Sequence, residues 1–222
     1  DVSVRPFLAK GDSGTIYTSD AIILATGARA KWLGLPTEEK YKGFGVSACA
    51  TCDGFFYRNQ EIVVVGGGNT AVEEALFLTK FATKVYVIHR RDEFRASQIM
   101  QDRVMGHEKI EVIWNSTVEK IIGDGAVSSV LIKDTVDSSE KELKLDGVFV
   151  AIGHDPNVGF LNNFVELDEK GYIKTGFTTD TSTSVPGVFA AGDVADSIYR
   201  QAITAAGTGC QAAIDSERWL DH

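Results

Sequence analysis

The stretch EIVVVGGGNTAVEEAL, residues 61–76, decides the fold of this 222-residue chain. It opens with an apolar run rich in β-branched side chains, which predicts a buried strand, and it ends with apolar side chains at helical spacing. Between them, Gly66-x-Gly68-x-x-Ala71 is typical of a dinucleotide-binding turn, whose backbone N–H groups face a pyrophosphate. An ordinary tight turn is the alternative interpretation. The residues expected to contact the dinucleotide here are Gly66, Gly68, Asn69 and Thr70.

The end of the next predicted strand, residues 84–88, indicates which dinucleotide binds. A site for NAD carries Asp or Glu at this point to accept hydrogen bonds from the ribose hydroxyls. This chain instead continues as HRRDEFR, residues 89–95, and guanidinium groups match the charge and paired oxygens of a 2'-phosphate. We therefore predict NADPH as the cofactor, although a solvated loop with Asp92 and Glu93 paired to the arginines is an alternative. The predicted contacts are His89, Arg90, Arg91 and Arg95.

Two cysteines, Cys49 and Cys52, precede this region with two residues between them. That spacing allows a small, reversible disulfide at the start of a helix, where the positive end of the helix dipole favours a thiolate. Asp53 follows directly and is placed to give or take the proton that dithiol exchange requires, although a first-turn carboxylate of this kind also serves as a simple helix-stabilising charge.

The other interpretations of the cysteine pair are half a zinc site and a static cross-link. The remaining candidate ligands, Cys210 and four histidines, do not stand at ligand spacing, so we predict no metal site. A static cross-link of such a short loop adds little stability. Redox use is the favoured hypothesis.

The amino-acid composition argues against several classes of partner and of protein. The net charge of -9 argues against nucleic acid or an anionic membrane as the main partner, and no apolar run approaches the ~18 residues of a membrane span. Three cysteines in a chain of this length do not make a secreted disulfide scaffold, which favours a reducing cytoplasm.

The flanking sequence predicts a second domain around the first. We expect a hairpin within residues 2–18, a strand buried on both faces at 21–26, and linkers at 28–41 and 154–157. Further expected elements are a helix at 97–105, strands at 110–114, 127–133 and 141–145, a strand at 147–153 that closes the sheet, a hairpin at 167–174, a buried strand before Gly192 and a helix at 201–220. Cys210, inside that last helix, is interpreted as a small core residue.

Several motifs together resemble one family: CATCDG at 49–54, the glycine turn, HRRDEFR, AAGD at 190–193 and YRQAITAAGTGC at 199–210. The family is the low-molecular-weight thioredoxin reductases, and the resemblance runs along essentially the whole chain. It implies an α/β protein with two Rossmann-like nucleotide-binding domains, in which an NADPH domain is inserted into an FAD domain. The domains are expected at residues 1–32 and 158–222 for FAD, and at 33–157 for NADPH.

The resemblance also implies a function. Electrons would pass from NADPH through FAD to the dithiol and on to thioredoxin, in a cytoplasmic protein that is usually a homodimer. Cys52 would face the flavin, Cys49 would attack the thioredoxin disulfide, and Asp53 would be the acid. The remaining implied cofactor contacts are Ile152 and Gly153 for NADPH, and Gly192, Asp193, Arg200, Gln201 and Ala202 for FAD.

The sequence departs from the family pattern at its start. The family begins with another glycine-rich strand–turn–helix, and residues 1–26 supply none. The chain is therefore expected to be an N-terminally truncated form with a partial FAD domain. An NADPH-binding fragment without turnover and a flavoprotein similar to alkyl hydroperoxide reductase are the alternative functions, the latter disfavoured by Arg90 and Arg91.

Overall fold

The computed structural model describes residues 4–221. Its contacts divide the chain into two compact units. Unit 2 is Ala30–Gly153, and unit 1 consists of the described parts of Asp1–Arg29 and His154–His222. Each of the hydrophobic clusters found among the described residues lies within one unit. Where the chain passes between the units, strands β4 (Ala28–Ala30) and β13 (His154–Pro156) pair with each other.

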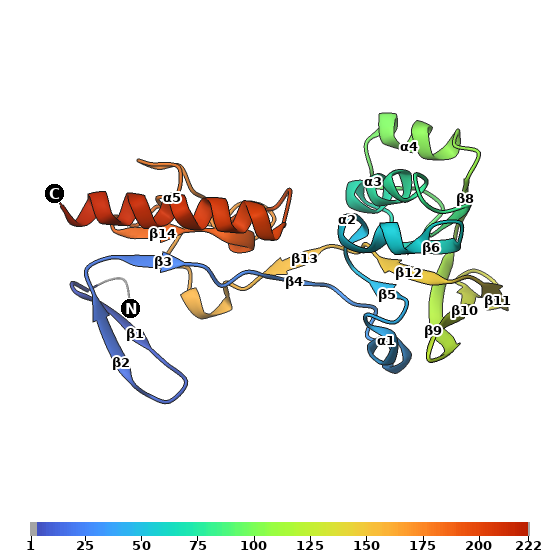
Figure 1. The fold of residues 1–222 in the computed structure, drawn as a ribbon, viewed down its shortest axis with the longest axis horizontal. Helices are drawn as coiled ribbons and strands as arrows, with labels where there is room; N and C mark the ends of the chain where they lie inside the picture. Colours follow the sequence, from blue (N-terminus) through green and yellow to red (C-terminus); the bar gives the residue numbers. More distant parts are fainter. Residues whose placement is uncertain (1–3, 222) are drawn as a thin grey trace. The chain divides into compact units, whose positions relative to one another are not determined.

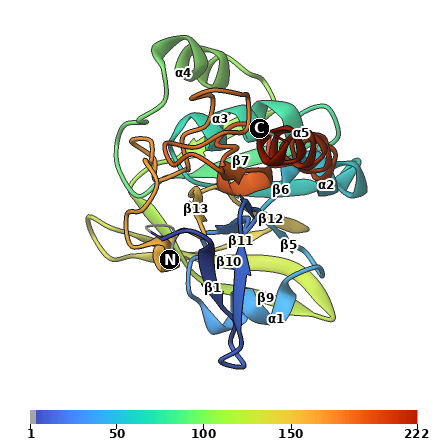
Figure 2. The ribbon, with the colours of Figure 1, turned by 90° about the vertical axis from the view of Figure 1, so that its left-hand side faces the viewer.

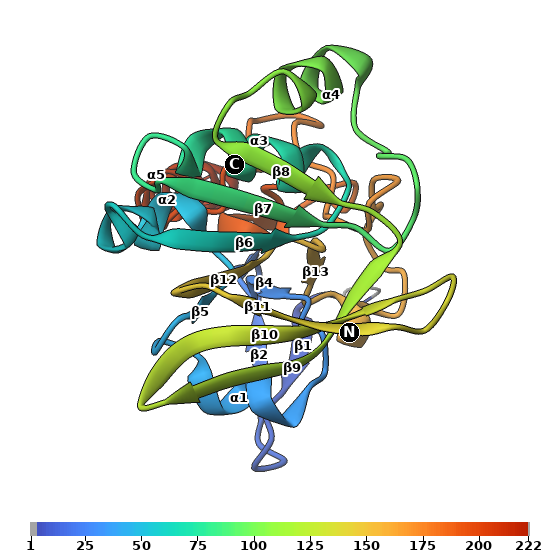
Figure 3. The same ribbon diagram turned by 90° about the vertical axis from the view of Figure 1, so that its right-hand side faces the viewer.

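Unit 2 is built on a five-stranded parallel sheet in the order β5-β12-β6-β7-β8 (Figure 3). The strand β6 lies at its centre and is almost entirely buried, as its apolar run predicts. Because all these strands run in parallel, their carboxyl ends meet at one edge of the sheet. The strands are β5 (Val46–Ser47), β6 (Glu61–Val65), β7 (Lys84–Ile88), β8 (Ile110–Ile113) and β12 (Gly147–Val150).

The two faces of this sheet are covered differently (Figure 3). Helices α3 (Asn69–Leu78) and α4 (Gln98–Met105) pack on one face and form a core with β6 and β7. An antiparallel sheet of β9 (Ser116–Asp124), β10 (Ala126–Asp134) and β11 (Glu140–Lys144) contributes to the core on the other face. The short helix α1 (Pro36–Tyr41) contacts β9, and its Tyr41 joins that second core.

Besides the β4–β13 pair at its boundary, unit 1 contains two further strand pairs and one long helix. The hairpin of β1 (Phe7–Lys10) and β2 (Ile16–Ser19) is antiparallel and extends as a narrow ribbon (Figure 2). The strands β3 (Ile22–Leu24) and β14 (Val188–Ala190) are parallel, and helix α5 (Ala202–Leu220) runs along them (Figure 1). Two single-turn 3-10 helices, η2 (Gly159–Leu161) and η3 (Gly192–Val194), complete the unit.

The predicted element types agree with the structure over most of the chain, including the hairpin turn at 10–14, the strand–turn–helix at 61–78 and the last helix. Residues 2 and 3 of the expected hairpin segment lie outside the described residues. The expected hairpin at 167–174 is reduced to a single antiparallel bridge between Leu167 and Ile173. The segment interpreted as a linker, 28–41, contains the strand β4 and the helix α1.

Three expectations about burial and order are wrong. The strand at 22–24 is not buried on both faces, because Ile23 is 40% exposed on the side away from Leu24. Cys210 is exposed rather than a core residue, since among the described residues of α5 only Ala212 is buried. The strand β12 does not close the parallel sheet but lies inside it, because the two-residue strand β5 adds beyond it. The long strand β9 was not predicted at all.

Candidate active site

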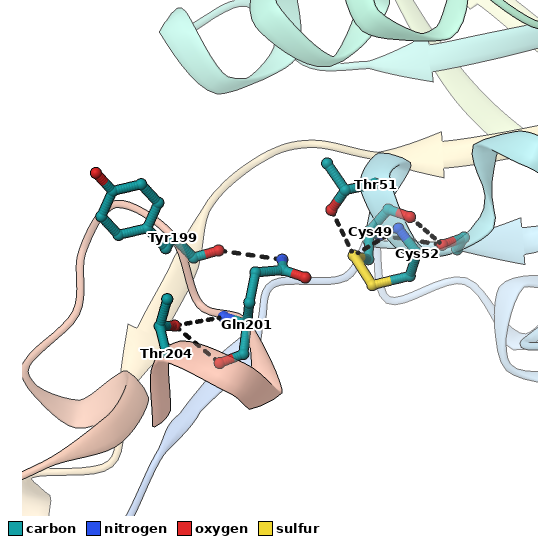
Figure 4. Close-up of a disulfide and its surroundings, with 7 residues drawn as sticks. Cys49, Thr51, Cys52, Tyr199, Gln201 and Thr204 are labelled. Atoms are coloured by element: carbon teal, nitrogen blue, oxygen red, sulfur yellow. Dashed lines mark hydrogen bonds between the residues drawn. A yellow bond between two sulfur atoms is a disulfide. The ribbon is translucent and has the colours of Figure 1, made fainter. Parts of the chain in front are cut away.

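The dithiol lies at the start of the short helix α2 (Ala50–Asp53), directly after β5. Cys49 and Cys52 are joined as a disulfide. Cys49 is the N-cap residue, and its Sγ accepts a hydrogen bond from the backbone N–H of Cys52 at 3.3 Å. Because a disulfide sulfur carries no proton, the Thr51 hydroxyl is the donor in its 3.4 Å contact with the same Sγ (Figure 4). The Ser47 hydroxyl accepts the N–H of Cys49 at 3.0 Å.

Asp53 lies in the first turn of α2, where the sequence places the candidate acid. The next turn is the 3-10 helix η1 (Gly54–Tyr57), which packs closely, since a Cβ at Gly54 would lie 2.8 Å from the Leu78 side chain. Burial raises the pKa of the nearby Tyr57 hydroxyl, and the negative charge of Asp53 adds to the shift. Tyr57 therefore stays protonated at neutral pH.

A cavity of about 500 Å³ lies at the carboxyl ends of β6, β7 and β12 in unit 2. This is the edge at which parallel α/β sheets bind nucleotides. The residues predicted for the dinucleotide that line the cavity are Gly66, Gly68, Thr70, His89, Arg90, Arg95, Ile152 and Gly153. Its other walls are formed by Trp32, Leu33 and residues 116–118, which the sequence did not indicate.

The glycine turn is required by the close packing around it. A Cβ at Gly66 would lie 2.5 Å from the backbone O of Ala151, and one at Gly67 would lie 2.2 Å from the His89 ring. A Cβ at Gly68 would meet nothing within 4 Å, and this residue is the N-cap of α3 beside the cavity. The space above Gly68 is therefore available to a phosphate group, which is the fit that a dinucleotide requires.

His89 is buried under this turn and is 5% exposed. Its Nε2 atom has no hydrogen-bond partner among the described residues. Burial lowers the pKa of His89 below its ordinary value of 6.5; a hydrogen bond to the Glu93 backbone opposes the shift, and the charges of Arg95, Arg91 and Arg90 add to it. The imidazole is therefore neutral at pH 7, and its Nε2 atom is buried beneath the glycine turn, unpartnered within the described part of the chain.

The loop that carries the arginines is attached to the glycine turn, because the N–H of Arg95 donates to the Gly67 carbonyl at 2.7 Å. Arg90 and Arg95 line the cavity. Two of the residues predicted to contact the nucleotide, Arg91 and Asn69, do not line the cavity. The Asn69 side chain instead accepts the N–H of Ser97 at 2.8 Å, which connects the start of α3 to the start of α4.

In unit 1, the residues implied for FAD lie on η3 and at the start of α5. Gly192 and Asp193 are in η3, and the N–H of Gly192 donates to the Thr208 hydroxyl at 2.9 Å. Gln201 is the N-cap of α5 and forms a reciprocal capping box with Thr204 (Figure 4). Ala202 is the first residue of the helix. The first N–H groups of such a helix have no partner inside it and are suited to phosphate oxygens.

Asp196 is a residue of this region that the sequence analysis missed. Its carboxylate accepts the backbone N–H groups of Ile198, Tyr199 and Arg200 at 2.8–2.9 Å. Burial raises its pKa, but these hydrogen bonds outweigh burial, so the pKa of Asp196 is lowered overall. An Asp followed by a turn is the available sequence signal. Asp196 thereby fixes the loop that carries Arg200, which has a left-handed backbone with φ of 49°.

Comparison with known proteins agrees with this arrangement. Residues 4–209 match the family model described as pyridine nucleotide-disulphide oxidoreductase. The thioredoxin reductase of Rickettsia conorii is 55% identical over 224 residues, which cover 100% of this chain and 72% of that protein. The chain belongs to the thioredoxin reductase family. Its relative from Escherichia coli O157:H7 is 56% identical over 231 residues, covering 100% of this chain and 71% of that protein.

A solved structure, the thioredoxin reductase from Giardia duodenalis, superposes with a TM-score of 0.94 at 48% identity and covers 100% of this chain and 73% of that one. As a thioredoxin reductase, the chain is an NADPH-dependent flavoprotein oxidoreductase with a redox-active disulfide, and FAD and NADPH are its cofactors. Within residues 4–221, no helix combines the length and apolar character that a membrane span requires.

Proposed function

We propose that the residues described above carry the reduction of a thioredoxin disulfide in this chain. The observation that supports this most directly is that one sheet positions both the dithiol and the nucleotide cavity. Cys49 follows β5, and β5 pairs with β12, whose carboxyl end borders the cavity. One sheet thus carries both the disulfide that receives electrons and the cavity assigned to the nucleotide that supplies them.

We assign the cavity in unit 2 to NADPH. The turn from Gly66 to Gly68 with Thr70 would hold the pyrophosphate, and Arg90 and Arg95 would hold the 2'-phosphate. The His89 ring would support the glycine turn from below, because a Cβ at Gly67 would lie only 2.2 Å from it. Arg91, which lies outside the cavity lining, would contribute positive charge near the phosphate.

We assign the surface of η3 and the start of α5 in unit 1 to FAD. Gly192 and Asp193 would contact the flavin end, and Arg200, Gln201 and Ala202 would hold it at the helix terminus. Ile198, Tyr199 and Ile203 are 71%, 65% and 80% exposed, so this surface carries apolar groups suited to an aromatic ring system. When bound, FAD accepts a pair of electrons from NADPH and delivers it to a disulfide.

The dithiol then transfers these electrons to the protein substrate. Two electrons and two protons convert the Cys49–Cys52 disulfide to two thiols, and Asp53 would supply or remove a proton. The Cys49 thiolate attacks the thioredoxin disulfide and forms a mixed disulfide. The Cys52 thiolate displaces it, which restores the Cys49–Cys52 bond and releases the reduced thioredoxin dithiol.

The surface next to the dithiol suits a protein partner. Phe55 and Phe56 lie in η1, the turn after α2, and are 57% and 75% exposed. The Arg58 guanidinium lies 4.5 Å from the centre of the Phe55 ring. Exposed aromatic rings with a flanking arginine are typical anchors of protein interfaces. We further propose that the protein is cytoplasmic. We also propose that it acts as a homodimer, and sedimentation analysis of the purified chain tests this oligomeric state.

A single-turnover experiment tests the assignment of the dithiol. The chain is reduced chemically, freed of reductant and mixed with an oxidised thioredoxin. We expect one thioredoxin disulfide to be reduced per chain, and Cys49→Ser to abolish the transfer. Full transfer by the Cys49→Ser variant, or none by the parent chain, would contradict the assignment.

A further inference from the structure

Glu38 is a buried carboxylate that the assignments above do not use. It lies in the first turn of α1 and is 2% exposed. Among the described residues, no lysine or arginine forms an ion pair with it. Its Oε1 instead accepts the backbone N–H of Leu33 and its Oε2 accepts that of Gly34, each at 2.9 Å. A buried charge is stable only when such hydrogen bonds compensate it.

The backbone that Glu38 holds forms a wall of the nucleotide cavity. Trp32 and Leu33 both line the cavity. On the other side of this segment, the N–H of Lys31 donates to the carbonyl of Gly153 at 2.9 Å. The ammonium group of Lys42 lies 4.1 Å from the centre of the Trp32 ring and covers it. The wall is therefore fixed at the Lys31, Trp32 and Leu33–Gly34 positions by three separate contacts.

The sheet order indicates which part of the nucleotide this wall faces. The arginines follow β7, and the glycine turn follows β6. The neighbour of β6 on the other side is β12, and Gly153, which bonds Lys31, follows β12. A dinucleotide whose 2'-phosphate lies at β7 and whose pyrophosphate lies at β6 extends its nicotinamide half towards β12.

We propose that Glu38 is a positioning residue for the nicotinamide half of NADPH. By holding the amides of Leu33 and Gly34, its carboxylate keeps the Trp32–Leu33 wall in place before the nucleotide binds. This inference rests on the assignment of the cavity to NADPH. Among the described residues, the hydrogen bonds of the Glu38 carboxylate go to Leu33 and Gly34 and not to the glycine turn or the arginines, so the proposed effect is confined to the nicotinamide end of the ligand.

Two ligands and three variants test the inference. The ligands are NADP+ and adenosine 2',5'-bisphosphate, which lacks the nicotinamide half, and their affinities are measured by calorimetry. Glu38→Gln loses one acceptor for a buried N–H, a change of about 1 kcal/mol, so we expect about a fivefold weaker affinity for NADP+. The affinity for the bisphosphate is expected to stay within about twofold. Amide exchange at Leu33 and Gly34 should accelerate in the same variant.

The control is Glu111→Gln, the same substitution at a surface position of unit 2. Glu111 forms an ion pair with Lys84, its side chain is 55% exposed, and neither residue lines the cavity, so both affinities should equal those of the parent. Trp32→Ala removes the wall itself and is expected to weaken the affinity for NADP+ while leaving that for the bisphosphate nearly unchanged. It therefore provides the test if Glu38→Gln does not fold.

Equal weakening of both ligands by Glu38→Gln would show a general loosening of the fold and overturn the inference. Unchanged affinity for NADP+ would also overturn it. A parent chain that binds neither ligand would instead contradict the assignment of the cavity, and the inference with it.

Discussion

At the scale of single residues, the site depends on a few side chains whose charge state is set by their surroundings. Arg90 and Arg95 line the cavity at the end of β7 and bring positive charge to it. His89 lies beside them, and burial lowers its pKa. We therefore expect the guanidinium groups to recognise a phosphate, whereas the neutral His89 ring adds no charge of its own.

Arg90→Ala should change the choice of cofactor. A hydrogen bond to a charged group contributes about 1.5–3 kcal/mol, so we expect NADPH to bind about tenfold to a hundredfold more weakly. NADH, which has no 2'-phosphate, should bind almost as it does to the parent. Fluorescence titration with both cofactors measures the effect, and an unchanged preference for NADPH would contradict the role of Arg90.

The stability of unit 2 should depend on pH through His89. The folded chain keeps this imidazole neutral, whereas the unfolded chain protonates it with a pKa near 6.5. The unfolded state therefore binds more protons as the pH falls below 6.5, and the free energy of unfolding decreases by up to about 1.4 kcal/mol per pH unit until the folded pKa is reached. Urea unfolding at pH 7.5 and 5.5 should show that the free energy of unfolding falls more for the parent than for His89→Gln. Equal losses would mean that His89 titrates normally.

Thr51 should tune the reactivity of Cys49. Its hydroxyl donates to the Cys49 sulfur in the disulfide, and the same hydrogen bond would stabilise a thiolate more strongly. We expect Thr51→Val to raise the pKa of the Cys49 thiol by about half a unit to one unit, whereas Thr51→Ser retains the hydroxyl and the parent pKa. The pH dependence of Cys49 alkylation, followed by mass spectrometry, measures the pKa. Equal values for the Val and Ser variants would exclude the proposed contribution.

At the scale of secondary-structure elements, the turn from β6 to α3 contains one glycine that close packing requires and another that we expect the ligand to require. Gly66 lies against the backbone of Ala151 at the end of β12, which cannot move without disturbing the sheet. Gly68 has open space where its side chain would be. Neighbouring glycines of one motif are thus required for different reasons.

Substitution of these two glycines should separate the two effects. Gly66→Ala places a Cβ 2.5 Å from the Ala151 oxygen and should destabilise unit 2 by about 1–3 kcal/mol. Gly68→Ala should leave the thermal midpoint nearly unchanged but weaken NADP+ binding at least about tenfold, because the methyl group occupies the space of the pyrophosphate. Thermal unfolding and calorimetry together give both values. A stable Gly66→Ala variant, or a Gly68→Ala variant with parent affinity, would contradict this explanation.

At the scale of the whole molecule, each unit has its own core. The clusters around β6 and on both faces of the parallel sheet consist of residues of unit 2, and those around β3 and β14 consist of residues of unit 1. A segment with a complete core can fold independently of the rest of its chain.

Residues 30–153, expressed alone, should therefore fold and bind NADP+ with an affinity within about threefold of the whole chain, because every residue that lines the cavity belongs to unit 2. Circular dichroism and calorimetry check both properties. The Arg90→Ala form of the fragment controls for nonspecific binding. An unfolded fragment, or a folded one without affinity, would show that unit 1 is needed for the site.

The sequence by itself determined the elements whose signal is local. The apolar run with its glycine turn predicted β6 and α3, and the spacing of Cys49 and Cys52 predicted a disulfide at a helix start. The phosphate site at the arginines after β7 stays a prediction. In each case the chemistry is contained in a few consecutive residues, so no knowledge of distant contacts is needed.

Only the tertiary structure decided what depends on contacts between distant residues. It placed β12 inside the sheet, because the short β5 pairs beyond it, and it brought Trp32 and Leu33 to the cavity from a segment interpreted as a linker. It also showed that Cys210 is exposed and that Glu38 is buried against backbone amides. Burial and pairing partners are properties of the packed chain, and a residue's own type does not specify them.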